Sequence, residues 1–380
     1  MKIRLGDVFE IGSGGTPSKT HPEYYGGVIP WVKTGDLKEM YLYDVEDTIT
    51  ENGLNNSSAK LYEPNTVLIA MYGATIGATS ILKLKACTNQ ACAAFKPNSN
   101  VMPEFLYYFL CSRREKFIKD GVGGAQPNIS AGYLKKVEME LPEIGEQEKI
   151  VNILTKISGI IDKREQELQR LDELIKSRFV EMFDGIIEKT RPVDFEEICE
   201  FVTVGIANSA THAFCDDGVI MFRNQNIKED YLDTSDIIHI TPDFASKYKT
   251  KRLKKDDLLI VRTGYPGVAC LVPEQYEGCQ TFTTLIARLK DSVAINPRFI
   301  CHYINSDYGK KYVKDNSAGA AQQNFGATAL SKLPVHLPVI ELQNEYIEFV
   351  EHIDKLKVVV QKALGEAQTL IDSLMQKYFG

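Results

Sequence analysis

An internal repeat is the strongest constraint on how this chain can fold, because ten residues of its first half recur after a constant step of 196 residues. The matched residues are Gly123, Ala125, Gln126, Asn128, Leu134, Lys136, Leu141, Pro142, Ile144 and Gln147, which recur as Gly319, Ala321, Gln322, Asn324, Leu330, Lys332, Leu337, Pro338, Ile340 and Gln343. A repeat of this length indicates two similar domains. Two similar domains in one chain are suited to holding two similar ligands a fixed distance apart.

Composition excludes several classes of protein. The 380 residues are 44% hydrophobic and 25% charged, which is ordinary for globular domains. No apolar run approaches the roughly 20 residues that span a bilayer, and the first residues lack the apolar core of a signal peptide. The eight cysteines form no C-x-x-C pair and the six histidines are scattered. We therefore expect reduced, mostly buried thiols of a cytoplasmic protein, and no metal site.

The net charge of −7 is unevenly distributed along the chain. Residues 143–185 contain ten acids and seven bases, and residues 341–380 contain seven acids and four bases. These two segments carry nearly all of the negative charge and leave the rest of the chain close to neutral. A neutral domain can still present a basic face, so the charge neither indicates nor excludes a nucleic-acid partner.

The repeat predicts four blocks: a first domain over 1–142, a long helix over 143–185, a second domain over 186–340 and a second long helix over 341–380. Within the domains, continuous apolar runs over 66–71 and 257–261 are typical of buried strands. Each domain also has an apolar segment opened by a proline, Pro103 or Pro297, which favours a helix beginning there. We expect an α+β fold in which each domain is mixed α/β with short strands.

Apolar residues recur at steps of three and four through both helical segments, although the pattern in the first is interrupted at Lys163-Arg164-Glu165. A helix of about 35 residues spans about 50 Å and needs a partner to cover such a stripe. Because the chain returns after the first helix to form the second domain, an antiparallel coiled-coil pair separating the two domains is the simplest arrangement. The alternative is two independent helices, each lying on its own domain.

Several short motifs resemble those of a known family. The motifs of the first domain, in chain order, are Gly12-Ser13-Gly14-Gly15-Thr16-Pro17-Ser18, Gly27-Val28-Ile29-Pro30-Trp31, Gly35-Asp36, Gly73-Ala74-Thr75-Ile76-Gly77, Thr88-Asn89-Gln90, Gly124-Ala125-Gln126-Pro127-Asn128 and Leu141-Pro142-Glu143-Ile144. Together with the duplication and the helices, they resemble the specificity subunit of a type I restriction–modification system over essentially the whole chain. The second domain departs from the pattern, for example at Val204-Gly205-Ile206-Ala207.

This resemblance implies a DNA-recognition subunit that has no catalytic activity of its own. Each target-recognition domain reads one half of a bipartite double-stranded DNA target, and the helices set the spacing between the halves. The helices also bind two methyltransferase subunits, which carry the S-adenosylmethionine, so this chain is expected to bind no cofactor. Restriction or translocase subunits can complete such a complex. The implied symmetry of the duplicated chain is a pseudo-twofold.

The candidate DNA-binding residues are polar and basic side chains on turns beside the predicted sheets. Arg and Lys suit guanine, Asn and Gln suit adenine, and hydroxyl groups suit phosphates. In the first domain they are Ser13, Thr16, Ser18, Lys19, Lys33, Thr34, Tyr72, Asn89 and Gln90. In the second domain they are Arg223, Asn224, Gln225, Asn226, Arg262, Thr263, Tyr265 and Gln280. Each of them, and also the repeated pairs Gln126/Asn128 and Gln322/Asn324, could instead have a structural role in its loop.

Catalytic interpretations are weaker. Gly12-Ser13-Gly14-Gly15 is not followed by the Lys of a phosphate-binding loop, which favours a tight turn with a close backbone approach. A nuclease-like set of Pro22-Glu23 and Asp36-Leu37-Lys38 has Asn226 in place of Asp36 in the repeat. Two other functions remain open at this stage, a duplicated coiled-coil scaffold and a stand-alone DNA-acting enzyme.

Overall fold

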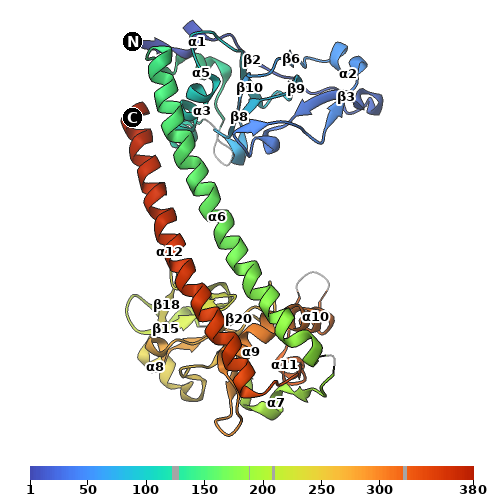
Figure 1. Cartoon of the computed structure of the whole chain (residues 1–380), viewed down its shortest axis with the longest axis vertical. Helices are drawn as coiled ribbons and strands as arrows, with labels where there is room; N and C mark the ends of the chain where they lie inside the picture. The colour runs from blue at the N-terminus through green and yellow to red at the C-terminus, as the bar shows by residue number, and fades with distance from the viewer. Residues whose placement is uncertain (122–127, 188, 208–209, 320–322) are drawn as a thin grey trace. The chain divides into compact units, whose positions relative to one another are not determined.

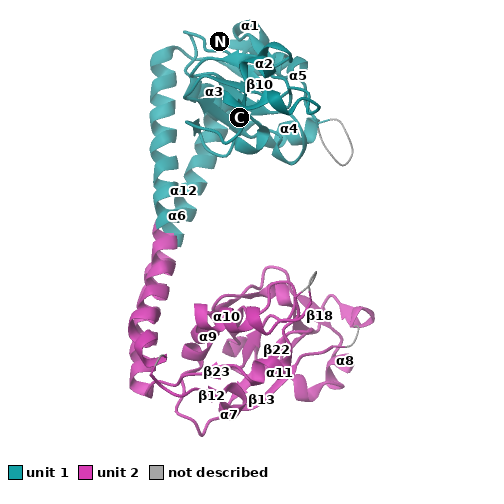
Figure 2. Cartoon of the chain, turned by 90° about the vertical axis from the view of Figure 1, so that its right-hand side faces the viewer, with its two compact units in different colours: residues 1–166, 361–380 teal, residues 167–360 magenta. Residues whose placement is uncertain are grey.

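The chain forms two compact units in the computed structural model, which describes residues 1–121, 128–187, 189–207, 210–319 and 323–380. Met1–Gln166 and Gln361–Gly380 make the first unit, and Glu167–Val360 make the second (Figure 2). Two long helices, α6 (Ile144–Ile187) and α12 (Ile340–Phe379), each contribute one segment to each unit (Figure 1). The boundaries between these units fall inside both long helices, so they do not coincide with the four predicted blocks. The division into four blocks therefore stays a prediction.

Unit 1 contains two small mixed sheets and a cluster of short helices. The larger sheet has the order β2 (Ile11–Ser13), β10 (Cys92–Phe95), β7 (Val67–Ala70), β8 (Thr79–Leu82), β4 (Tyr41–Leu42). The other has the order β5 (Thr48–Ile49), β3 (Tyr25–Val32), β9 (Ala86–Thr88), β6 (Leu61–Tyr62). The remaining elements are the pair β1 (Lys2–Arg4) and β11 (Glu138–Glu140), with α1 (Leu5–Val8), α2 (Glu51–Asn55), α3 (Pro103–Ser112), α4 (Arg114–Asp120) and α5 (Ala131–Lys136).

Unit 2 repeats this plan. One sheet has the order β13 (Cys199–Val204), β22 (Leu285–Leu289), β19 (Leu258–Ile260), β20 (Ala269–Leu271). The other has the order β14 (Phe214–Cys215), β18 (Ile238–Ile240), β15 (Val219–Phe222), β21 (Gln280–Thr281). The remaining elements are the pairs β12 (Val193–Asp194) with β23 (Pro334–Val335) and β16 (Ile227–Lys228) with β17 (Tyr231–Leu232), and the helices α7 (Phe195–Ile198), α8 (Pro242–Ser246), α9 (Pro297–Asn305), α10 (Asp307–Asp315) and α11 (Ala327–Ser331).

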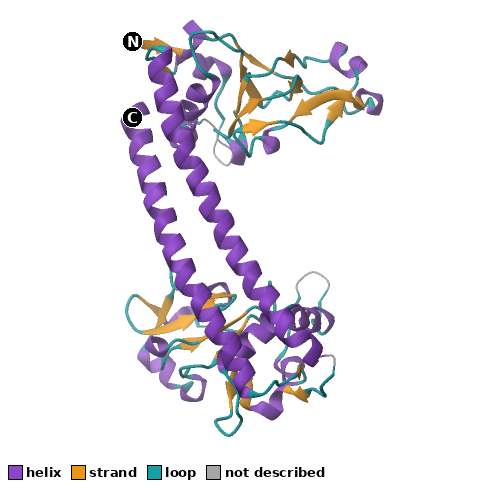
Figure 3. Ribbon diagram, in the orientation of Figure 1, coloured by secondary structure: helices purple, strands orange, loops and turns teal. Residues whose placement is uncertain are grey.

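The α+β fold class predicted from the sequence is confirmed, with short strands joined by turns in both units (Figure 3). Every residue of β7 and of β19 is buried, as the apolar runs indicated. Pro103 and Pro297 each occupy the first turn of a helix, α3 and α9. Proline is tolerated there because the first amides of a helix have no partner within it.

Within unit 2 the two long helices run antiparallel in direct contact. Asp172 of α6 forms an ion pair with Lys357 of α12, and Arg178, further along α6, forms one with Glu345, nearer the start of α12. The alternative in which each helix lies only on its own domain is therefore wrong for this unit.

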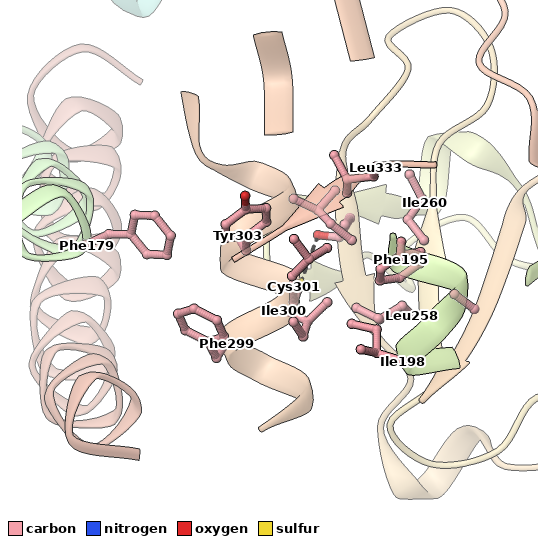
Figure 4. Close-up of a cluster of buried hydrophobic side chains, with 14 of the residues drawn as sticks. Phe179, Phe195, Ile198, Leu258, Ile260, Phe299, Ile300, Cys301, Tyr303 and Leu333 are labelled. Atoms are coloured by element: carbon pink, nitrogen blue, oxygen red, sulfur yellow. Dashed lines mark hydrogen bonds between the residues drawn. The ribbon is translucent and has the colours of Figure 1, made fainter. Parts of the chain in front are cut away.

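Aromatic side chains anchor both helices to the second domain. Phe183 of α6 is fully buried, and its ring centroid lies 4.9 Å from that of Phe299 of α9 and 5.5 Å from that of Tyr346 of α12. Phe179, one turn earlier, points from α6 toward Phe299 and Tyr303 (Figure 4). Burial of such rings supplies several kcal/mol of apolar stabilisation each.

Unit 1 has the same arrangement, in which the end of α12 takes the place that the end of α6 has in unit 2. Phe379, which follows Phe183 by 196 residues, is buried near the end of α12 and packs its ring edge-on against Phe105 and Phe109 of α3. Arg113 donates a hydrogen bond to the Phe379 carbonyl group. Each domain is thus held by the start of the helix that follows it and by the last turns of the other long helix.

Helix α6 is continuous through Lys163-Arg164-Glu165, where its apolar pattern is interrupted. The boundary between the two units follows directly, at Gln166 and Glu167. The polar interruption is therefore not a break in the helix. It lies at the boundary between the part of α6 that belongs to unit 1 and the part that belongs to unit 2.

The repeated glutamines fix each long helix to the domain before it. Gln147 and Gln343 are fully buried. The Gln147 side-chain oxygen accepts from the Met102 amide at 2.9 Å, and that of Gln343 accepts from the Asn296 amide at 3.0 Å. Their side-chain nitrogens donate to the carbonyl groups of Pro142 and Pro338 respectively.

We expect Gln343→Ala to destabilise unit 2 by about 2–4 kcal/mol, because it leaves a buried amide and a buried carbonyl group without partners. Urea unfolding and hydrogen exchange at the Asn296 amide measure the effect. The matched control is Gln361→Ala on the exposed face of the same helix, which should stay within about 0.5 kcal/mol of the wild type. Equal stability of the two variants would contradict this role for Gln343.

Candidate nucleic-acid interface

The candidate residues of unit 1 gather where three strands end. β2 ends at Ser13, β3 at Val32 and β9 at Thr88. The Gly15 amide donates to the Thr88 carbonyl group and the Asn89 amide donates to that of Val32, each at 2.9 Å. Three segments that are distant in the sequence therefore form one edge of the domain.

Glycine is required at this edge by a close approach of two backbones. A Cβ atom at Gly14 would lie 1.8 Å from the Thr88 carbonyl oxygen, and one at Gly205 in unit 2 would lie 2.4 Å from that of Thr281. The close backbone approach expected of Gly12-Ser13-Gly14-Gly15 is confirmed at Gly14, but Gly12 and Ser13 lie in strand β2 and not in a tight turn. Gly14 packs against Thr88, the last residue of β9, and Gly205 packs against Thr281, the last residue of β21. The second domain therefore keeps this close approach although its sequence differs.

The loop after β3 and the loop after β15 share the same strand pairing and the same backbone-to-side-chain hydrogen bond. β3 pairs in parallel with β9 through Val32 and Thr88, and β15 pairs in parallel with β21 through Phe222 and Thr281. In the turn that follows, the Asp36 carboxylate accepts from the Lys33 amide at 2.7 Å. The Asn226 side-chain oxygen accepts from the Arg223 amide at 2.8 Å.

This match assigns a structural role to Asp36. Because the amide oxygen of Asn226 makes the same hydrogen bond, the negative charge of Asp36 is not needed for it. The nuclease-like interpretation of Asp36 with Glu23 therefore has no support: Glu23 instead contacts the His21 ring at 2.8 Å.

In unit 2 the candidates from two distant segments contact each other. Asn224 donates from its side-chain nitrogen to the Thr263 hydroxyl group at 2.9 Å, and the Tyr265 hydroxyl group donates to the Asn224 carbonyl group at 2.9 Å. Arg262 donates from Nε to the side-chain oxygen of Asn324 at 3.0 Å. The segments over 223–226, 262–265 and 324 thus form one surface, which the sequence did not show.

The residue Asn128 takes part in the equivalent contact of unit 1. It forms a backbone bridge with Tyr72, just as Asn324 does with Thr263. The repeated glutamines Gln126 and Gln322 lie outside the described residues. Of the repeated pairs, Asn324 has a structural role in its loop, because its backbone also pairs with Ala318.

Exposure differs among the remaining candidates. Ser18 and Lys19 are exposed, as is Gln90, whose side chain accepts from the Thr16 hydroxyl group. Ser13 and Thr34 are half-buried at the strand ends. Tyr72 and Tyr265 are 41% and 44% exposed, which is enough for a ring to stack or for a hydroxyl group to reach a phosphate.

Two candidates are inside the domain, contrary to expectation. Asn226 is 1% exposed and donates to the carbonyl groups of Asp233 and Asp236, so its side chain holds the loop together. Gln280 is fully buried and donates to the carbonyl groups of Ala245 and Tyr248. Gln280 lies within β21 and not after it, which directs its side chain into the core. Neither residue is available to a ligand at the surface.

Two acids that the sequence analysis did not select complete the surface. Asp236 forms an ion pair with Arg223 at 2.9 Å, and Asp47 forms one with Lys33. The hydrogen bond from Lys33 to Asp47 raises the pKa of the Lys33 ammonium group and outweighs the opposing effect of desolvation. Only the strand register brings these groups together, so a search restricted to bases and amides overlooks them.

A half-buried ionic cluster ties the turn between β16 and β17 to helices α9 and α12. Arg298 of α9 contacts Asp230 in this turn at 2.5 Å and Asp354 of α12 at 2.6 Å. Desolvation raises the pKa of Asp230, but the hydrogen bonds and charges of His302 and Arg298 outweigh it and lower the pKa to about 2.

We expect the stability of unit 2 to fall in acid through Asp230. A carboxyl group whose folded pKa is depressed contributes its stability above the unfolded pKa, near 4, and loses it as the pH falls toward 2. The contribution is on the order of 2 kcal/mol, of which roughly 1 kcal/mol should be lost by pH 3. Urea unfolding from pH 6 to pH 3 should show the gap between wild type and Asp230→Asn narrowing by that amount. A constant gap would contradict this.

Three further features of the described chain bear on metal binding, cysteine reactivity and membrane insertion. Its residues include no group of His, Cys, Asp and Glu placed to hold a metal ion. All eight cysteines are free thiols and five are buried, and burial raises the pKa of Cys92 to about 12. None of the described helices combines the length and apolar composition of a membrane span.

Comparison with known proteins identifies the family. The type I restriction modification DNA specificity domain matches residues 1–173 and again 188–365. The chain therefore belongs to this family and contains its domain twice.

Individual relatives agree with this assignment. The specificity subunit of the type I restriction enzyme MjaIX of Methanocaldococcus jannaschii is 32% identical over 47% of this chain and 43% of its own length. That of EcoR124I/EcoR124II of Escherichia coli is 28% identical over 50% of this chain and 48% of its own length. The matches to these two relatives span less than half of their length. That of StySPI of Salmonella potsdam is 23% identical over 92% of this chain and 80% of its own length.

Solved structures share the fold. A chain from a structure describing complex assembly and conformational transition of the type I restriction–modification system covers 100% of this chain and 97% of its own length, with a TM-score of 0.61 and 14% identity. The crystal structure of the type I restriction–modification system S subunit from M. genitalium covers 100% and 96%, with a TM-score of 0.53 and 15% identity.

Proposed function

We propose that this chain is the sequence-specific DNA-recognition subunit of a type I restriction–modification complex, and that each domain reads one half of a bipartite target. The main support for the proposal is a loop whose backbone geometry, its frame, occurs in both domains but whose side chains differ between them. Lys33-Thr34-Gly35-Asp36 occupies the frame in one domain and Arg223-Asn224-Gln225-Asn226 occupies it in the other. A fixed frame with variable donors and acceptors is what reading two different half-sites requires.

The exposed and half-buried polar groups of the second domain suit base recognition. Arg223 can donate two hydrogen bonds to guanine, and Gln225 can pair with adenine. Tyr265 and Thr263 provide hydroxyl groups beside them for the DNA backbone. The first domain has Lys33 in the position of Arg223 but Gly35 in the position of Gln225, so its half-site is expected to differ.

In this proposal the chain has no catalytic role of its own, in keeping with its relatives, which are specificity subunits. The chemistry belongs to partner subunits in the cytoplasm. Two methyltransferase subunits bind the paired helices and carry the S-adenosylmethionine, and restriction or translocase subunits can join them. The duplicated junctions at Gln147 and Gln343 support two partner copies, because a pseudo-twofold chain presents the same surface twice.

Co-expression with the methyltransferase subunit tests the proposal. We expect methylome sequencing of a host without other methyltransferases to show one bipartite motif with two different half-sites. Native mass measurement should show two methyltransferase copies per chain. A methylated motif without a spacer, or a complex saturated with one copy, would overturn the corresponding part of the proposal.

The long helices α6 and α12 should set the distance between the two half-sites. Inserting four residues at Lys163-Arg164-Glu165 of α6, with a matched insertion in α12 after Gln361, should lengthen both helices by about 6 Å, slightly under two base pairs. We expect the methylated motif to gain one or two spacer base pairs while both half-sites stay the same. A changed half-site would show that this helical region reads DNA.

A further inference from the structure

We call the loops over 33–36 and 223–226 the reading loops. Each of them pairs a cation with an acid that lies just before the neighbouring strand, β5 or β18. In unit 2, Met221 of β15 pairs with Ile238 of β18, so Arg223 and Asp236 lie opposite each other two positions beyond this pair. Arg223 Nη2 forms an ion pair with the Asp236 carboxylate at 2.9 Å and donates a hydrogen bond to the Asp236 carbonyl group at 3.1 Å. These two contacts hold the guanidinium group beside Asp236.

The same carboxylate oxygen also holds Gln225. Its side-chain nitrogen donates to Asp236 Oδ2 at 2.5 Å. Asp236 therefore contacts Arg223 and Gln225, two of the side chains of this loop that suit base reading. In the described part of the chain its other oxygen, Oδ1, accepts no hydrogen bond, and the side chain is 67% exposed against 29% for Arg223.

The first domain repeats the pair with other residues. Lys33 occupies the position of Arg223 and forms an ion pair with Asp47. The backbone of Asp47 is held by β3, because its carbonyl group accepts from the Trp31 amide at 2.9 Å. The cation–acid pair thus occurs in both domains although the remaining loop side chains differ.

A carboxylate is unfavourable on a surface that only has to attract DNA. Each acid cancels the charge of a cation that could neutralise a phosphate, and it repels the phosphates themselves. An exposed ion pair also contributes little to folding stability. Its presence in both domains is explained if the acid acts in discrimination, where a wrongly placed charge excludes incorrect sequences.

We propose that Asp236 is a specificity-determining residue that reads one G·C base pair together with Arg223, and that Asp47 positions Lys33 in the same way. This rests on the proposed function. In the major groove, guanine presents two acceptors, O6 and N7, and the paired cytosine presents the N4 amino donor. The Arg223 guanidinium group supplies the donors and Asp236 Oδ1 supplies the neighbouring acceptor, in one fixed arrangement.

The inference predicts opposite changes in specific and non-specific binding. In Asp236→Asn, discrimination at one G·C pair of one half-site should fall by roughly 5- to 150-fold, the range for one good base contact. Affinity for a scrambled duplex should rise, and its logarithm should depend more steeply on salt concentration, by about one additional phosphate contact. A merely structural role would weaken both kinds of binding together.

The experiment uses the full chain with its methyltransferase partners and two duplexes, one containing the methylated motif and one scrambled, between 50 and 200 mM salt. Asp236→Glu should restore part of the discrimination because it keeps the carboxylate. Glu274→Gln is the matched control, since it removes one exposed acid of the same domain that pairs with Lys255 and with neither reader. Asp47→Asn should affect only the other half-site.

Unchanged discrimination in Asp236→Asn would overturn the inference, and so would parallel loss of specific and scrambled-duplex binding. Equal gains of scrambled-duplex affinity in Asp236→Asn and Glu274→Gln, without loss of discrimination, would also overturn it. If the wild-type complex preferred no duplex at all, the proposed function itself would fail, which is a separate result.

Discussion

Replacing Phe183 with alanine is expected to destabilise unit 2 by about 3–5 kcal/mol, the usual effect of removing a large buried ring. Phe183 is fully buried between Phe299 of α9 and Tyr346 of α12, so the cavity would open where two helices and a domain meet. Total stabilities of domains are about 5–15 kcal/mol, so the loss is a large fraction.

Region-resolved hydrogen exchange measures this result. Protection should fall in α9 and in the first turns of α12, which belong to unit 2. Phe379→Ala should instead reduce protection in α3 of unit 1, and by less, because Phe379 lies in the last turn of α12, where the helix can fray.

The matched control is Val180→Ala, on the same helix as Phe183 but 45% exposed. It should change stability by no more than about 0.5 kcal/mol. Equal loss of protection in both units of Phe183→Ala, or none in either, would contradict the assignment of this ring to the core of unit 2.

The elements that the sequence predicted well are those set by local pattern. The apolar runs that became β7 and β19, the prolines that open α3 and α9, and the periodic stripes of α6 and α12 each follow from neighbours within a few residues. The constant step of the repeat added long-range information, because it matched Gln147 with Gln343 before the equivalent hydrogen bonds of the two side chains were known.

The candidate site was less predictable because burial of a polar side chain depends on distant strands. Gln280 is polar and lies two residues after Gly278, which favours a turn. However, β21 pairs in parallel with β15, about 60 residues earlier, and this register turns Gln280 into the core. Asn226 is buried for a similar reason, since its partners Asp233 and Asp236 follow an intervening hairpin.

The ion pairs of the reading loops were missed for a complementary reason. An acid on a proposed DNA surface is normally counted against binding, so neither Asp47 nor Asp236 was selected. Their position opposite or diagonal to the cation comes only from strand pairing, which the separation in sequence does not reveal. The antiparallel register of β15 with β18 and of β3 with β5 is therefore the information that the sequence alone did not provide.

The double substitution Arg223→Ala with Gln225→Ala is expected to relax or abolish reading of one half-site and to leave the other unchanged. Each good base contact is worth about 1–3 kcal/mol of discrimination. The two losses should not add fully, because both side chains bond to Asp236 and are coupled through it. Methylome sequencing should show degenerate bases in one half of the motif only.

Two controls separate reading from general attraction to DNA. Lys255→Ala removes an exposed cation of the same domain that pairs with Glu274, and it should weaken binding to all sequences slightly without changing the motif. Lys33→Ala should alter the opposite half of the motif, because Lys33 occupies the equivalent frame of unit 1. An unchanged motif in the double variant would show that this loop does not read bases. Degeneracy in both halves would show that the two domains do not read independently.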